Sequence, residues 1–371
     1  MKNPYSGKPD YAFWKRSVSS LGISEVDPVV SAPFLINLGD KIATAGSCFA
    51  QHISRTLTSE GYDYLVTESA PRSIAAVDDG YGVFPARFGN IYTVRQLLQL
   101  FLRAYGLFHP VDSVWWRADG RAVDPFRPRV QESGFAGREE VESDRIEHFK
   151  AVREMFERAN VFVFTLGLTE GWVSDIDGAV FPIAPGVVAN PDIGDSISFR
   201  NFTVREMEED LTKFISLLRG VNPAIKIILT VSPVALVATY EARHVLVSTC
   251  YSKSALRVVA EDASRGHSNV AYFPSYEIIT GAYARSSYFE DDLREVRPEG
   301  VTHVMRLFKR HYLAGTDAMD SGAETPAARP VDLRPDHTAR RAEGGASTAE
   351  HMKQLQKIIC DEEVLDQDFG S

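Results

Sequence analysis

The chain has 371 residues, of which 44% are hydrophobic and 24% charged, and its formal net charge is −10. This composition is ordinary for a globular protein with a sizeable core, and the negative charge argues against a nucleic-acid-binding surface. The sequence holds no run of 18 apolar residues, so no membrane span is expected. The three cysteines, Cys48, Cys250 and Cys360, are too few and too scattered for a disulfide framework or a zinc site. The N-terminus also lacks the apolar core of a signal peptide, and a cytoplasmic protein is therefore expected.

The first half of the chain predicts strands and helices after an irregular segment. That segment covers residues 1–38, and its aromatic residues 11–14 are expected to pack onto the body of the protein. A loop rich in Gly, Pro and Arg and a Trp- and Pro-containing insertion interrupt the regular elements further on. In chain order we predict a strand at 41–45, a helix at 49–57, a short strand at 62–66, a loop at 67–92, a helix at 93–102 and an insertion at 107–136.

The second half repeats the alternation of strands and helices. The continuous apolar run at 161–166 is typical of a central parallel strand. Thr203 and Glu206 form a capping-box pattern, which predicts the start of a helix. The predicted elements are a helix at 139–159, a strand at 161–166, an insertion at 173–202, a helix from 203 that stops before Asn222, a strand at 225–231, a helix at 252–261, a strand at 270–273 and a helix at 298–312.

This alternation predicts an α/β fold, a three-layer α/β/α sandwich with a central, mainly parallel sheet. Ligands in such sheets bind beyond the carboxyl ends of the strands. Ser47, Gly167, Ser232 and Pro274 each follow a predicted strand and are expected to converge there. Residues 1–312 are predicted to form a single domain. Residues 313–371 lack apolar periodicity and are expected to be a flexible tail with a short helix near 347–360.

A serine stands at the junction of the first predicted strand and helix, where residues 46–50 read Gly-Ser-Cys-Phe-Ala. A sharp turn there would hold the Ser47 hydroxyl at a helix N-terminus, where free N–H groups favour developing negative charge. That geometry suits an acyl-transfer nucleophile. It also suits a simple N-cap. The neighbouring Cys48 either packs under the helix or, with a depressed thiol pKa, attacks in its place.

Further short motifs follow in a specific order. They are Asn-Pro-Tyr at 3–5, Ala-Phe-Trp at 12–14, Phe-Gly-Asn-Ile-Tyr at 88–92, Thr-Leu-Gly-Leu-Thr-Glu at 165–170, Thr-Val-Ser-Pro-Val at 230–234, Ser-Lys at 252–253 and Tyr-Phe-Pro-Ser-Tyr-Glu at 272–277. With residues 46–50, this set resembles the GSCFA domain family, a branch that looks related to the SGNH/GDSL hydrolases. The resemblance covers roughly residues 1–312. It implies an SGNH-like, flavodoxin-like sandwich with loop insertions over the carboxyl edge of the sheet.

The resemblance also implies roles for individual residues. Ser47 would be the nucleophile, and its own N–H, the N–H of Gly89 and Thr169 would hold the oxyanion. Gly89 and Asn90 would belong to the second block of the oxyanion and substrate site, and Gly167 and Thr169 to the third. Thr169 stands where the SGNH pattern has Asn. Its hydroxyl can donate one hydrogen bond, but losing a good oxyanion donor costs about 10²–10³ in rate.

The proton acceptor departs further from that pattern. Asp292 has the spacing of an Asp-x-x-His block, but Glu295 occupies the histidine position. A carboxylate is a poor base for a serine hydroxyl at neutral pH unless burial raises its pKa. His303, on the last predicted helix, and His244, in a loop, are alternative bases; either could equally be an ordinary surface or core histidine.

Several other residues allow a functional and a structural interpretation. Glu170 and Trp172 could line an active-site wall on which a sugar ring stacks, or form a salt bridge and fill the core. Ser252 and Lys253 could be a catalytic serine–lysine pair, or a helix cap and a surface ion pair. Three arginines in aromatic, Pro-containing loops could clamp an anionic substrate group or be solvated charges: Arg87, Arg127 and Arg129.

The function expected from the sequence is that of a serine-dependent esterase or O-acyltransferase that acts on an acylated carbohydrate, in polysaccharide biosynthesis. The partner would be a small molecule or glycan; no cofactor and no metal are expected, because neither a nucleotide loop nor metal-ligand spacing appears. The sequence does not indicate an oligomeric state. The alternatives are a carbohydrate-binding protein that has lost the base, and a transferase that uses Glu170, Glu277 or Glu295 while Ser47 only caps the helix.

Overall fold

The structure is a computed structural model that describes residues 3–47, 49–70, 80–192, 194 and 196–314. The predicted tail therefore lies outside the described residues from 315 on, as do Cys48 and Cys360. In the part of the chain that is described, no helix is both long and apolar enough to cross a membrane.

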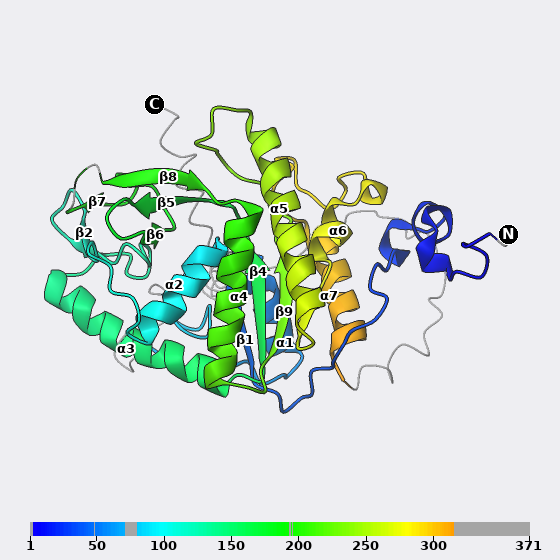
Figure 1. The fold of residues 1–371 in the computed structure, drawn as a ribbon, viewed down its shortest axis with the longest axis horizontal. Coiled ribbons are helices and arrows are strands. Elements are labelled where there is room, and N and C mark those ends of the chain that lie inside the picture. Colours follow the sequence, from blue (N-terminus) through cyan, green and yellow to red (C-terminus); the bar gives the residue numbers. More distant parts are fainter. Residues whose placement is uncertain (1–2, 48, 71–79, 193, 195, 315–371) are drawn as a thin grey trace, which may run out of the picture.

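A parallel sheet forms the centre of the molecule (Figure 1). Its strands lie in the order β1 (Ile42–Gly46), β4 (Val161–Leu166), β9 (Lys226–Val231) and β10 (Val270–Tyr272). A single parallel bridge between Ile42 and Tyr64 lies on the other side of β1. If the extended segment at Tyr64 is counted as the second strand in chain order, the strands lie side by side in the order 2-1-3-4-5. This is the strand order of flavodoxin-like sheets. Four of the five predicted strands are confirmed to within two residues, whereas the strand predicted at 62–66 is reduced to this bridge.

Helices cover both faces of the sheet and confirm the three-layer α/β/α sandwich. Alternate strand residues serve the two faces: Phe162 and Phe164 join one core, and Val161 and Val163 the other. The first core is covered by α2 (Val94–Ala104), α3 (Arg138–Arg158), α4 (Val204–Val221) and α5 (Val245–Gly266). The second lies under α1 (Ala50–Ser59), α6 (Ser275–Thr280) and α7 (Pro298–Tyr312).

Two small antiparallel sheets form the predicted insertions, beside α2 and α3 in Figure 1. One has the order β3 (Ala122–Val123), β2 (Trp115–Trp116) and β7 (Asn190–Pro191). The other has the order β6 (Val180–Phe181), β5 (Glu170–Ser174) and β8 (Ile197–Asn201). The second insertion begins at Glu170, three residues earlier than predicted, so Glu170 and Trp172 lie on a strand.

Three features differ from the prediction. Helix α5 begins at Val245, whereas the sequence predicted a start at 252. The prediction was late because Leu246 and Val247 in the first turns are exposed, so these turns show no pattern of buried residues. The short helix α6 was not predicted. The N-terminal aromatic segment is not packed onto the body, since Trp14 keeps 67% of its surface exposed; it forms 3₁₀ and π turns between Asp10 and Glu25.

Candidate active site

The turn after β1 requires glycine at position 46. Gly46 has φ +135°, and a Cβ placed on it would lie 2.3 Å from the carbonyl oxygen of Thr165 on the neighbouring strand. Its own carbonyl accepts a hydrogen bond of 2.9 Å from the N–H of Ile91. The end of β1 is therefore pressed between β4 and the segment 88–91, and this contact fixes where the next residue, Ser47, lies.

The Ser47 hydroxyl is buried and unpaired. Ser47 is 4% exposed, and its Oγ has no hydrogen-bond partner among the described residues. Its carbonyl accepts from the N–H of Ala50, which leads the chain into α1. The position is the carboxyl edge of the sheet between β1 and β4, the point at which the strand order reverses and ligands bind in such folds. A buried polar group without a partner is rare and is a mark of functional sites.

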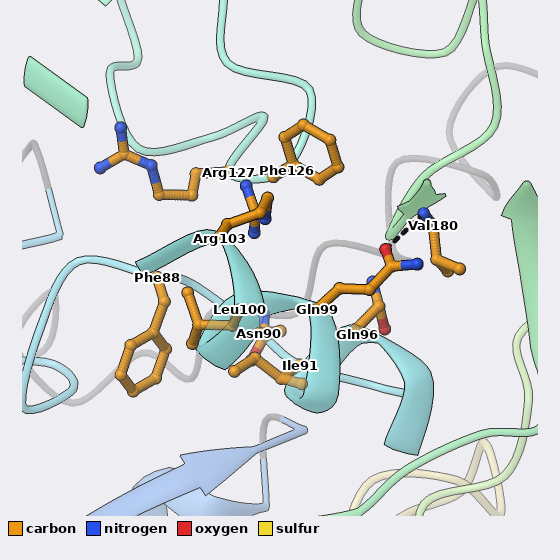
Figure 2. A pocket seen from close by; sticks show the side chains of 10 residues that line it. All are labelled: Phe88, Asn90, Ile91, Gln96, Gln99, Leu100, Arg103, Phe126, Arg127 and Val180. Carbon is orange, nitrogen blue, oxygen red and sulfur yellow. Dashed lines mark hydrogen bonds between the residues drawn. The ribbon is translucent and has the colours of Figure 1, made fainter. Parts of the chain in front are cut away.

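The segment 88–91 brings Gly89 and Asn90 to the same edge. Gly89 is half-buried with φ +71°, and its N–H has no acceptor among the described residues. Asn90 is buried and lines a small cavity of about 20 Å³ beside α2 (Figure 2). The N–H of Ile91 donates to the carbonyl of Gly46, the residue before Ser47. Gly89, whose N–H is free, lies two residues before Ile91 in the chain.

The loop after β4 closes the other side of Ser47. A Cβ placed on Gly167 would lie 3.2 Å from the Cβ of Ser47, so only glycine allows this approach without a shift. The carbonyl of Tyr92 accepts from the N–H groups of both Gly167 (3.0 Å) and Leu168 (2.9 Å). Two residues later the Oγ1 of Thr169 is buried and has no partner within the described ranges. The Oγ1 of Thr165, near the end of β4, is likewise buried without a partner there.

Two residues in the middle of α5 hold that loop in place. Lys253 is fully buried and its Nζ donates to the carbonyl of Gly167 over 2.7 Å. The Oγ of Ser252 accepts from the N–H of Thr169 over 3.1 Å. The interpretation of this pair as a helix cap and a surface ion pair is therefore wrong. Both side chains face the candidate site, and sequence reasoning missed this because α5 was predicted to start at 252.

The structure therefore brings Gly167 against Ser47, and it brings the segment 88–91 to the end of β1 through the hydrogen bond from Ile91 to Gly46. The N–H of Ser47 itself donates to the carbonyl of Thr165 over 3.3 Å and is not free. Among the described residues, the N–H of Gly89 and the hydroxyls of Thr165 and Thr169 have no hydrogen-bond partner. Within the described residues, no group of three or more His, Cys, Asp or Glu side chains is arranged to hold a metal ion.

Both histidines considered as bases are engaged elsewhere. His303 lies on the buried face of α7, where its Nδ1 contacts the hydroxyl of Tyr288 at 2.7 Å and its Nε2 the carbonyl of Val26 at 3.0 Å. His244 is exposed, and its Nδ1 accepts from the N–H of Leu246 as the N-cap of α5. Neither ring has a recorded hydrogen bond to Ser47, and each has a structural task.

The carboxylates named from the sequence lie in three different places. Asp292 is exposed, and its Oδ1 accepts from the N–H groups of Arg294 and Glu295 in a tight turn. The Nε of Arg294 donates to the carbonyl of Ala235, in the loop after β9, which holds this turn at the carboxyl edge. Glu277 lies on α6 and is bonded to both Arg257 and Tyr272.

Glu170 lies nearest in sequence to the loop that contacts Ser47. Burial raises its pKa, although its carboxylate accepts a hydrogen bond of 2.7 Å from the hydroxyl of Thr239. Two strand positions on, the ring of Trp172 packs edge-on to Tyr240, with 4.9 Å between ring centres, and to Phe199. Tyr240 is 70% exposed. A half-buried carboxyl group thus lies beside an accessible aromatic group.

Two of the three loop arginines are buried rather than solvated. Arg87 and Arg127 both donate to Asp144, over 2.9 and 2.7 Å, and Arg127 also pairs with the fully buried Asp124. Arg129 is exposed. The buried pairs connect the segment before Gly89 to the first insertion and to α3, and so brace the loop that carries the candidate oxyanion donor.

The histidine of this charged cluster makes stability depend on pH. His148 is buried and contacts Glu68 at 2.7 Å; burial first, and then Arg127, lowers its pKa from 6.5 to about 4. As the pH falls below 6.5, His148 becomes protonated in the unfolded chain, whereas in the folded chain it stays neutral down to about pH 4. His148 alone should therefore lower the free energy of unfolding by about 3 kcal/mol over this window.

Denaturant unfolding at pH 7 and pH 4.5 measures this loss. The variant His148→Gln should lose much of the difference. It keeps a part that comes from His52, since burial lowers the pKa of that residue to about 4 as well. Equal stability of the wild-type protein at the two pH values would contradict the prediction.

Residues 41–308 match the model of the GSCFA family, and a comparison with curated proteins gives no match. A carbohydrate esterase of family 3 from Talaromyces cellulolyticus is similar with a TM-score of 0.28 and 11% identity, over 73% of this chain and 95% of that one. A serine-to-alanine mutant of an acetyl esterase, solved with an acetate ion, gives a TM-score of 0.27 and 11% identity over the same shares. TM-scores this low carry no weight for function.

Proposed function

The chain belongs to the GSCFA family, and we propose that it is a serine-dependent acyl-transfer enzyme, an esterase or O-acyltransferase, with Ser47 as the nucleophile. The observation that carries the proposal is the Ser47 hydroxyl, which is buried at the carboxyl edge and has no partner among the described residues. A hydroxyl that only capped a helix would accept a hydrogen bond from a backbone N–H of the first turn, and none is recorded here.

In the proposed reaction the Oγ of Ser47 attacks an acyl carbon and the ester oxygen leaves with a proton as an alcohol. The oxyanion that forms in between would be held by the N–H of Gly89 and the hydroxyl of Thr169, neither of which has a partner among the described residues. Water or a sugar hydroxyl then attacks the acyl-enzyme and releases Ser47. Attack by water is esterase activity, and attack by a sugar hydroxyl is acyltransferase activity.

A carboxylate is proposed to take the proton of Ser47, because His303 and His244 are engaged in structural contacts. Burial raises the pKa of Glu170, as a general base requires. Glu295 stands at the histidine position of the Asp-x-x-His block and lies in a turn at the carboxyl edge of the sheet. Glu170→Gln and Glu295→Gln distinguish them, since only the loss of the true base should slow the reaction of Ser47.

The acyl group is proposed to be carried by a carbohydrate. The support is the aromatic group of Trp172, Phe199 and Tyr240 next to Glu170, which offers an accessible face on which a sugar ring can stack. A cytoplasmic role in polysaccharide biosynthesis is the setting that we propose for this activity.

Treatment with a fluorophosphonate probe, followed by intact mass measurement, tests the nucleophile. We expect one adduct on the wild-type protein and none on Ser47→Ala. The control is Ser59→Ala, which removes an exposed hydroxyl of α1 that is bonded only to the carbonyl of Thr56. A folded wild-type protein that forms no adduct would contradict an activated serine.

A carbohydrate-binding protein without catalysis is the second candidate. It is favoured by one observation: among the described residues no imidazole is hydrogen-bonded to Ser47. On this alternative Ser47→Ala would bind a glycan as well as the wild type, and neither would react with the probe. If instead the chain is a transferase driven by a carboxylate, Ser47→Ala would keep full activity.

A further inference from the structure

A second site lies where the C-terminal end of α2 meets α3. A cavity of about 620 Å³ opens there, a size typical of small-molecule sites. Three arginines line it, namely Arg103, Arg145 and Arg153, together with the rings of Phe126 and Phe149. No Asp or Glu is among its lining residues, all of which belong to the described part of the chain. The wall is therefore cationic and aromatic.

Arg103 is the unusual member of this wall. It is only 9% exposed, yet its guanidinium has no hydrogen bond or ion pair with any described residue, and its Nε is fully buried. Its guanidinium carbon lies over the ring of Phe126 at 3.8 Å and 5.7 Å from the ring centre of Phe149. In Figure 2 it projects from α2 toward the loop that carries Phe126. Stacking on a ring occupies the face of a guanidinium and leaves its N–H edge to bind a ligand.

The surrounding charges leave Arg103 uncompensated. Asp124 is the anion that attracts it, but that carboxylate is shared with Arg127 and Arg145, which bond to it directly. Burial, and then Arg145 and Arg127, lower the pKa of Arg103 to about 9. Arg153 donates to the carbonyl of Ala104, and no carboxylate among the described residues pairs with it. Burying a cation without a counter-ion is costly, so this cavity is short of negative charge.

We propose that the cavity binds a small organic oxyanion, whose carboxylate or phosphate group takes the N–H edge of Arg103 with Arg153 beside it. Arginine forms paired hydrogen bonds with both groups. The volume leaves room for a ligand body of about disaccharide size. Helix α2 has eleven residues and spans about 15 Å. Its first turn adjoins the loop around Ser47 and its last turn adjoins this cavity. Arg103 and Phe126 also line the small cavity that holds Asn90, so the two sites are neighbours. Anion binding needs no reaction of Ser47, so this proposal does not depend on the proposed function.

Calorimetric titration of the full chain tests the proposal. The probes are glucuronate, glucose 6-phosphate and inorganic phosphate, with neutral glucose as the control ligand. We expect at least one sugar anion to bind tenfold or more tightly than glucose. Tighter binding of glucuronate would identify the anionic group of the ligand as a carboxylate, and tighter binding of glucose 6-phosphate would identify it as a phosphate ester. Binding of inorganic phosphate alone, or no binding of any anion at millimolar concentration, would overturn the proposal.

Substitutions locate the binding. Arg103→Met should weaken the bound anion by about tenfold to a hundredfold. The matched control is Arg158→Met on α3, which removes an exposed arginine paired with Glu154 outside the cavity. Without ligand, Arg103→Met should melt at the same temperature as the wild type or higher, because an uncompensated buried charge is removed. A lower melting temperature with unchanged anion binding would show a structural role instead. Should Arg103→Met not fold, Arg153→Met must weaken binding for the proposal to stand.

Discussion

Gly46→Ala is expected to prevent folding, or to lower the free energy of unfolding by more than about 4 kcal/mol. The added Cβ would lie 2.3 Å from the carbonyl oxygen of Thr165 and 2.8 Å from its Cβ, and both distances are far inside van der Waals contact. β4 lies inside the sheet between β1 and β9, and five residue pairs join it to β1, so neither strand can move away from the other without breaking this pairing. The φ of +135° adds strain for any L-residue. Expression and denaturant unfolding measure the effect.

Gly61→Ala separates the two causes of that loss. Gly61 also has a positive φ, +78°, but a Cβ there would meet nothing within 4 Å. It should cost about 1–2 kcal/mol, the price of a left-handed backbone alone. If Gly46→Ala were no worse than Gly61→Ala, the close approach of β1 to β4 would not be what requires glycine at this turn.

The fold could be predicted from the sequence because its signals are local. The apolar run at 161–166 became β4 without a change of boundary, and the capping box at Thr203 begins α4. Where the signal is not local, prediction failed. The strand at 62–66 has the right composition, but only Tyr64 pairs with β1. The first turns of α5 expose apolar side chains, which hides the helical period from a reading of the sequence.

The candidate site could be predicted only in part, since contacts between distant segments decide it. The positions of Ser47 and Gly167 after strands follow from the order of elements. The role of Lys253 does not, because it depends on α5 packing against the loop after β4, 86 residues away in the sequence. His303 was considered as a base because of its position in the sequence. In the structure its two ring nitrogens are hydrogen-bonded to the carbonyl of Val26 and the hydroxyl of Tyr288. The catalytic roles of the named residues remain predictions.

Gly167→Ala is expected to slow the reaction of Ser47 with a fluorophosphonate by about tenfold, because a shift of a few tenths of an ångström misaligns the reacting hydroxyl. The new Cβ would lie 3.2 Å from the Cβ of Ser47 and 3.2 Å from the carbonyl oxygen of Tyr92. That carbonyl is held by the N–H groups of Gly167 and Leu168, so the serine side chain is the part that must give way. The rate of adduct formation by mass measurement gives the effect.

Gly171→Ala is the matched control for that variant. Its Cβ would be crowded to a similar degree, 3.3 Å from a methyl carbon of Val180 and 3.5 Å from the ring of Phe202, but it touches only side chains and none at Ser47. Both variants should lose about 1–3 kcal/mol of stability from overpacking. Only Gly167→Ala should lose reactivity. If the two folded variants react equally fast, the loop after β4 does not position the serine; if both are slow, the defect comes from the insertion that Gly171 shares with Glu170 and Trp172.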